Sequence, residues 1–120
     1  MLAPGLVGIR TLRVTDSDTA SAVGSGDVPV LATPRVVALA EAATVAALAG
    51  ALDADRTSVG TRVEIDHLAP SPVGADVEAT AELVAVTDRR LTFEVRVSQD
   101  GREIARARVI RAVVDRARFP

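Results

Sequence analysis

The segment Pro34–Leu52 constrains the fold more than any other part of the chain, because it is apolar on nearly every side. Its start is predicted by Thr33 and Pro34. Threonine is a good helix N-cap, and proline suits the first helical position, where its missing N–H would be unpaired anyway. Beyond the first turn, Glu41 is the only charged residue. A helix without a polar face is expected to be buried inside the protein.

The rest of the chain predicts strands. Before the helix, Leu6–Val14 has the composition of a strand, and the small polar residues of Thr15–Val28 predict a long loop. Three segments after the helix alternate between apolar and polar residues, which is typical of strands with one buried face. Their inward-facing residues are expected to be Val59, Thr61, Val63, Ile65 and His67; Val77, Ala79, Ala81 and Leu83; and Leu91, Phe93, Val95 and Val97.

The chain ends in one further strand. Asp100-Gly101 predicts a hairpin turn, and the last strand is expected from about Glu103 to Val114. Its alternation is irregular, which indicates a bulge. Nothing else in the chain could cover the apolar helix, so the sheet itself must curl around it. We therefore expect one α+β domain over residues 1–120, with a long buried central helix wrapped by a curved antiparallel sheet of about five strands.

Composition excludes several kinds of function. The chain has 120 residues and a net charge of -2, which gives no electrostatic reason to expect nucleic acid or an anionic membrane as a partner. It has no cysteine and one histidine, which rules out a thiolate nucleophile and a multi-histidine metal site within one chain, and we expect no cofactor. The N-terminus lacks the pattern of a signal peptide, and no apolar run reaches membrane-spanning length, so we expect a cytoplasmic protein.

Two polar residues are predicted to point into the apolar interior. A carboxylate in a buried helix is costly unless it is paired, and such costs are often tolerated for function, which singles out Glu41. His67 continues the row of Val63 and Ile65 and so faces the same interior. Each has a structural explanation: Glu41 could reach solvent or a partner subunit, and His67 could close the core. Together they form a candidate acid–base pair.

Thr33 and Gly60 are weaker candidates. Capping alone explains a threonine at the start of a helix. However, a helix N-terminus also offers free N–H groups and a positive dipole end to a developing oxyanion. Gly60 could supply another N–H, because a residue without a side chain lets a substrate approach the backbone closely.

The spacing of these residues resembles the fluoroacetyl-CoA thioesterase family. The matching features are Ala32-Thr33-Pro34, Glu41 eight residues after Thr33, Gly60-Thr61, His67 twenty-six residues after Glu41, Ala69-Pro70-Ser71-Pro72-Val73-Gly74, and the ending Arg111-Ala112-Val113-Val114. The resemblance covers roughly residues 28 to 119. It implies a hotdog fold, which is the helix-in-sheet arrangement expected from the pattern, and a homodimer or higher oligomer with its active sites at the dimer interface.

The resemblance also implies a reaction, the hydrolysis of an acyl-CoA thioester to a free acid and CoA. Carried over, Glu41 is nucleophile or base, His67 activates water or transfers a proton, and Thr33 positions the reacting group. Gly60 and Arg111 become substrate-binding residues. The fluoroacetyl-specific member has phenylalanines just before its threonine, whereas residues 22–30 here contain no aromatic residue. We therefore expect an ordinary short or medium acyl group.

Two other functions would fit a chain of this fold. A non-catalytic module that binds acyl-CoA or another small ligand would share the fold and could lack the phenylalanines before the threonine. A hydratase of the same fold would place an Asp, and a His five residues later, near the start of the long helix. The only histidine here lies after the helix, on a predicted strand, which disfavours the hydratase.

Overall fold

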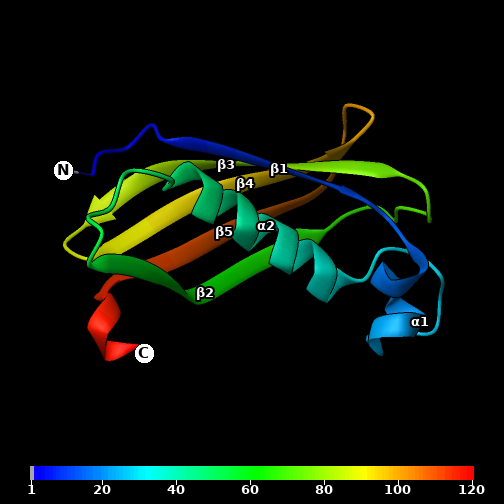
Figure 1. Cartoon of the computed structure of the whole chain (residues 1–120). Coiled ribbons are helices and arrows are strands. Elements are labelled where there is room, and N and C mark those ends of the chain that lie inside the picture. The colour runs from blue at the N-terminus through cyan, green and yellow to red at the C-terminus, as the bar shows by residue number, and fades with distance from the viewer. Residues whose placement is uncertain (1) are drawn as a thin grey trace.

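One antiparallel sheet of five strands curls around helix α2 in the computed structural model, which describes residues 2–120 (Figure 1). The elements are β1 (Val7–Arg13), η1 (Asp16–Asp18), α1 (Ala20–Val23), α2 (Thr33–Ala47), β2 (Arg56–His67), β3 (Asp76–Thr87), β4 (Arg90–Gln99), β5 (Arg102–Asp115) and η2 (Arg116–Arg118). The strand order across the sheet is β1-β3-β4-β5-β2, which leaves β1 and β2 as the two edges. The predicted central helix and curved sheet are confirmed.

The core lies between one face of α2 and the concave face of the sheet. The rows predicted to face inward on β3 and β4 are all buried, and they pack with the buried residues Val36, Leu39, Ala40, Ala43 and Ala47 of the helix. Close packing here depends on Gly8 of β1. A Cβ at that position would collide with the carbonyl oxygen of Ala43. Because glycine has no Cβ, β1 packs directly against the backbone of α2.

The expected helix differs from the structure in length and in burial. It ends at Ala47, and a turn with Gly50 in the left-handed region carries the chain on to Leu52. Only one face is buried, because the sheet of a single chain covers only one side of the helix. On the other side Val45 is 50% exposed. The prediction that the helix is buried all round is therefore wrong for one chain.

The segment before α2 also differs from prediction. The expected loop Thr15–Val28 contains the two short helices η1 and α1, and the side chain of Thr19 caps α1. The N-cap of α2 is Ala32, which makes no side-chain capping bond, and Thr33 is already the first helical residue. Figure 1 shows α1 beside the start of α2, at the end of the molecule where β2 finishes.

Three strands, β2, β3 and β5, carry bulges, and in β3 the pairing with β4 shifts at Val84. In β5 the pairing with β4 shifts at Ile104, which confirms the expected irregularity of that strand. In β2 the pairing with β5 shifts between Gly60 and Arg62, so Thr61 is an extra residue. A one-residue shift exchanges the two faces of a strand.

The β2 bulge corrects the predicted inward row. Val63, Ile65 and His67 stay on the helix side, as predicted, whereas before the bulge it is Ser58 and Gly60 that face the helix. The placement of Val59 and Thr61 on the inward row is wrong, because a pattern with period two does not reveal an inserted residue.

In residues 2–120, no helix is long and apolar enough to cross a membrane.

Candidate functional site

Thr33 and His67 meet at the end of the sheet. Thr33 lies in the first turn of α2 and His67 is the last residue of β2, and the distance between Thr33 Oγ1 and His67 Nδ1 is 2.7 Å. The Thr33 hydroxyl does not cap the helix, because the cap position belongs to Ala32. The capping explanation for Thr33 is therefore wrong, and its hydroxyl makes a hydrogen bond with the imidazole of His67 instead.

Burial favours the neutral form of the His67 ring, because it lowers the pKa of the imidazole from its ordinary value. The backbone of Ala69 next to the ring opposes this only in part. The second ring nitrogen, Nε2, is buried without a hydrogen-bond partner among residues 2–120. Buried polar atoms are rarely left unpaired, so this nitrogen is free to bond a substrate or a water molecule. A neutral imidazole with one nitrogen fixed and the other free is suited to proton transfer.

A cavity of about 290 Å³ opens beside this pair. The lining residues are mostly small or aliphatic: Ala20, Ser25, Gly26, Val28, Val30, Leu31, Thr33, His67, Leu68, Ala69 and Pro70. The segment after α1 forms one wall and the end of β2 the other. Both Val28 and Leu68 are about half exposed, so the mouth of the cavity is apolar. Such a cavity fits an acyl chain better than a charged group.

Glu41 lies in a second group of polar residues. Its carboxylate contacts Gly60, where an added Cβ would collide with Oε2. The Nη1 atom of Arg111 lies 3.6 Å from Glu41 Oε2. Glu41 remains partly open to solvent, with 38% of its side chain exposed, so it is neither buried nor a free surface residue.

Arg111 is a buried cation, only 7% exposed, in the inward row of β5. Its Nε donates to Ser58 Oγ at 2.9 Å, and its Nη2 donates to the Ser58 carbonyl oxygen at 3.2 Å. Burial lowers the pKa of Arg111, and the neighbouring Glu41 carboxylate acts in the opposite direction. An arginine stays protonated in proteins even so.

Sequence reasoning missed Ser58. The signal that could have found it is the charged Arg111 among the buried residues Ala107, Val109 and Val113, since a buried cation needs partners on the neighbouring strand.

The structure thus brings the predicted site residues together in two groups. Thr33 joins His67, and Glu41 joins Gly60 and Arg111. Along a straight helix, eight residues rise about 12 Å, so Thr33 and Glu41 of one chain do not touch.

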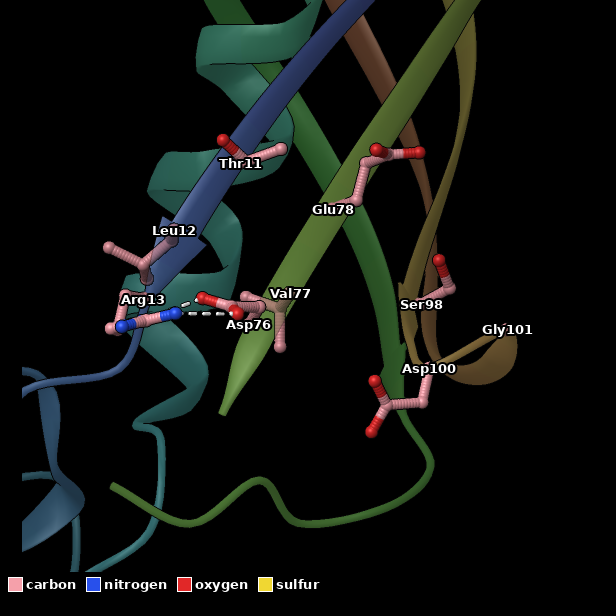
Figure 2. A pocket seen from close by; sticks show the side chains of 9 residues that line it. All are labelled: Thr11, Leu12, Arg13, Asp76, Val77, Glu78, Ser98, Asp100 and Gly101. Atoms are coloured by element: carbon pink, nitrogen blue, oxygen red, sulfur yellow. Dashed lines mark hydrogen bonds and ion pairs between the residues drawn. The ribbon is translucent and has the colours of Figure 1, made fainter. Parts of the chain in front are cut away.

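A larger cavity, of about 630 Å³, lies elsewhere. Figure 2 shows its lining on β1, β3 and the turn after β4, where the Arg13 guanidinium lies against the Asp76 carboxylate. Both bonds of this ion pair are 2.9 Å long. With Glu78 and Asp100 the lining has three carboxylates to one arginine, which opposes a polyanionic ligand such as CoA. None of the predicted site residues lines it.

Comparisons with known proteins agree with the fold. The solved structure of a thioesterase superfamily member from Thermus thermophilus superposes with a TM-score of 0.91 at 24% identity, covering 98% of this chain and 88% of that chain. A variant of the fluoroacetyl-CoA-specific thioesterase, solved with fluoroacetate and CoA, superposes with a TM-score of 0.90 at 30% identity, covering 99% of this chain and all of the other. The curved sheet around α2 is therefore the hotdog fold, as the sequence predicted.

The family follows from two further matches. The family model described as fluoroacetyl-CoA-specific thioesterase matches residues 14–117. The fluoroacetyl-CoA thioesterase of Streptantibioticus cattleyicolor is 38% identical over 90 residues, which are 75% of this chain and 65% of that protein. The chain belongs to the fluoroacetyl-CoA-specific thioesterase family, whose characterised relative is a thioester hydrolase. The matched segment spans slightly less than two thirds of that relative.

Proposed function

We propose that this protein hydrolyses an acyl-CoA thioester to the free acid and CoA. The observation that carries the proposal is the Thr33–His67 contact of 2.7 Å beside an apolar cavity, in a chain of a thioesterase family. In the reaction, water adds its oxygen to the thioester carbonyl carbon, the C–S bond breaks, and the CoA sulfur leaves with a proton. The protein must therefore supply a base, a proton route and a place for the carbonyl oxygen.

The site residues fit these tasks. Thr33 fixes the ring of His67, whose free Nε2 moves a proton between the attacking water and the leaving sulfur. Glu41 acts as nucleophile or as base, and its partial exposure allows substrate to reach it. The N–H of Gly60 is proposed to hold the thioester oxygen next to the Glu41 carboxylate, which lies against this residue. Arg111 is proposed to act at the substrate site mainly through Glu41, since little of its side chain is exposed.

The cavity supports a short or medium acyl group. Its lining contains no Phe, Tyr or Trp and includes the small residues Ala20 and Gly26. A Cβ added at Gly26 would lie 3.3 Å from the Ala20 Cβ, so this wall is already packed closely behind the cavity. We infer that the acyl chain lies along this wall, with its thioester carbon near His67.

We further propose a homodimer with the site at its interface. Strand β2 is a 12-residue edge with no partner on one side, and the face of α2 bearing the half-exposed Val45 is apolar. Unpaired edges and uncovered apolar faces are surfaces that a second copy can cover. Antiparallel pairing of β2 about a two-fold axis between Gly60 and His67 would bring each Thr33–His67 pair toward the Glu41 group of the partner subunit.

A thiol-release assay tests the activity. CoA release from acyl-CoAs of two to ten carbons is followed with a thiol-reactive dye, which has no background here because the chain lacks cysteine. We expect turnover to peak at a short or medium chain and to drop by about 10²–10⁴-fold in Glu41→Gln and in His67→Ala. Thermal stabilisation by CoA esters that are never cleaved would instead support the binding module and refute the enzyme.

A further inference from the structure

A chain of polar contacts leads away from Glu41 to a residue with no assigned role. Glu41 Oε2 faces Arg111 Nη1, and the other two edges of the same guanidinium are held by Ser58 alone, through its hydroxyl and its carbonyl oxygen. Among residues 2–120, Ser58 supplies every hydrogen bond that the Arg111 side chain makes. The orientation of this buried cation therefore depends on one serine.

The strand geometry explains why a serine is needed at this position. Gly60 pairs directly with Arg111 in the ladder between β2 and β5, so Ser58 is the diagonal neighbour on the same face. Gly60 has no side chain, and Glu41 occupies the space that this leaves. Ser58 is thus the nearest residue of β2 whose side chain can reach the guanidinium.

We propose that Ser58 is a positioning residue for the proposed thioester hydrolysis: by fixing the plane of the Arg111 guanidinium, it holds the Glu41 carboxylate at the reacting position. The inference rests on the proposed function of Glu41 and adds to it a residue that does not touch substrate.

The physical reason is the rigidity of the guanidinium. Its N–H donors lie in one plane, so two bonds to Ser58 leave one direction for Nη1, and that direction is toward Glu41. Without the Ser58 hydroxyl, Nε would be a buried donor without a partner, and the side chain would turn to find one. Glu41 is partly exposed and would then relax toward solvent, away from the Gly60 backbone. The loss would fall on the chemical step and not on substrate binding.

The first measurement separates kcat from KM. We expect Ser58→Ala to lower kcat about tenfold while KM changes less than about twofold, since only an interaction used in the transition state is lost. Ser58→Thr keeps the hydroxyl and should recover most of the rate. The matched control is Ser98→Ala on β4, where the serine makes no side-chain hydrogen bond within residues 2–120; it should keep the wild-type rate.

The second measurement shows whether the effect passes through Glu41. In a Glu41→Gln background, adding Ser58→Ala should cost almost nothing further, because residues that act as one unit are not additive. Arg111→Lys keeps the charge but lacks the planar fork of donors, and it provides a second variant with the same expectation.

The outcomes distinguish a failure of this inference from a failure of the proposed function on which it rests. If the wild-type protein releases no CoA, the proposed function fails. If the wild-type protein is active and Ser58→Ala keeps full kcat, or loses equally in both backgrounds, Ser58 does not position Glu41 and the inference is overturned.

Discussion

The hydroxyl of Thr33 lies 2.7 Å from Nδ1 of His67, so one hydrogen bond joins the first turn of α2 to the last residue of β2. The two residues are 34 positions apart in the chain. Because Ala32 occupies the cap position, the helix does not use this hydroxyl. The contact therefore links the helix to the imidazole, and its removal should affect activity more than stability.

Replacement of Thr33 tests this separation. Thr33→Ala should lower kcat by about 10- to 100-fold, because the imidazole loses the partner that fixes its ring. The free energy of unfolding should fall by only about 0.5–1.5 kcal/mol, since one hydrogen bond but no capping bond is lost. Thr33→Ser keeps the hydroxyl and serves as the control. Steady-state kinetics and urea denaturation give the two quantities; a loss of stability in Thr33→Ala without a loss of rate would contradict the assignment.

The lowered pKa of His67 predicts two pH dependences. Burial disfavours the imidazolium, so in the folded protein the pKa lies below the ordinary value of about 6.5. If the neutral imidazole is the form that accepts the proton, the acid limb of the pH–rate profile should therefore lie below pH 6.5.

Stability should respond in the same window. Between the lowered pKa and about 6.5, the unfolded chain binds more protons than the folded chain, so the free energy of unfolding should fall as the pH drops from about 6.5. His67→Gln, which cannot be protonated, should flatten this part of the stability curve. An unchanged slope in His67→Gln would show that another group is responsible.

Two glycines should respond to the same substitution in different ways. Gly60→Ala places a Cβ against the Glu41 carboxylate, a movable side chain, so the fold should survive while kcat falls at least about tenfold. Gly8→Ala places a Cβ against the backbone of α2, which cannot move aside, and should cost about 1–3 kcal/mol of stability. Thermal melting and thiol release, measured on both variants, distinguish them. Equal losses of stability would refute the contact between Gly60 and Glu41.

Mixed dimers test whether the site is shared between subunits. Thr33→Ala and Glu41→Gln homodimers are each expected to keep at most about a tenth of the wild-type rate. In a shared site, one of the two sites of a mixed dimer receives an intact Thr33 and an intact Glu41. Mixing the two impaired proteins after unfolding and refolding should then raise the rate to about a quarter of the wild-type rate, because half the dimers are mixed and one site in each is intact. No recovery would place the whole site within one chain.

Much of the fold was predictable from local pattern. The rows on β3 and β4 alternate regularly, and each predicted inward residue of those strands is buried. The long apolar helix could be located from its composition, but the extent of its burial could not. Residues such as Val45 are apolar and still exposed in one chain, because no segment within residues 2–120 covers them.

The identities of the site residues were more predictable than the contacts between them. Glu41 and His67 stand out as polar residues on apolar rows. The pairing of Thr33 with His67 depends on where α2 starts relative to the end of β2, which no periodicity reveals. Ser58 was missed because the bulge at Thr61 changes which face the preceding residues occupy.

Because of that bulge, the side chains of β2 exchange faces at Thr61. The face toward the helix is apolar between Thr61 and His67 and polar around Gly60. Regular pairing would be easier for the sheet and would turn Ser58 and Gly60 to the outer surface. Deletion of Thr61 would make the pairing of β2 with β5 regular and would remove the space that the Glu41 carboxylate occupies at Gly60. The geometry of the proposed site around Glu41 thus depends on Thr61, a residue that has no partner in the ladder between β2 and β5.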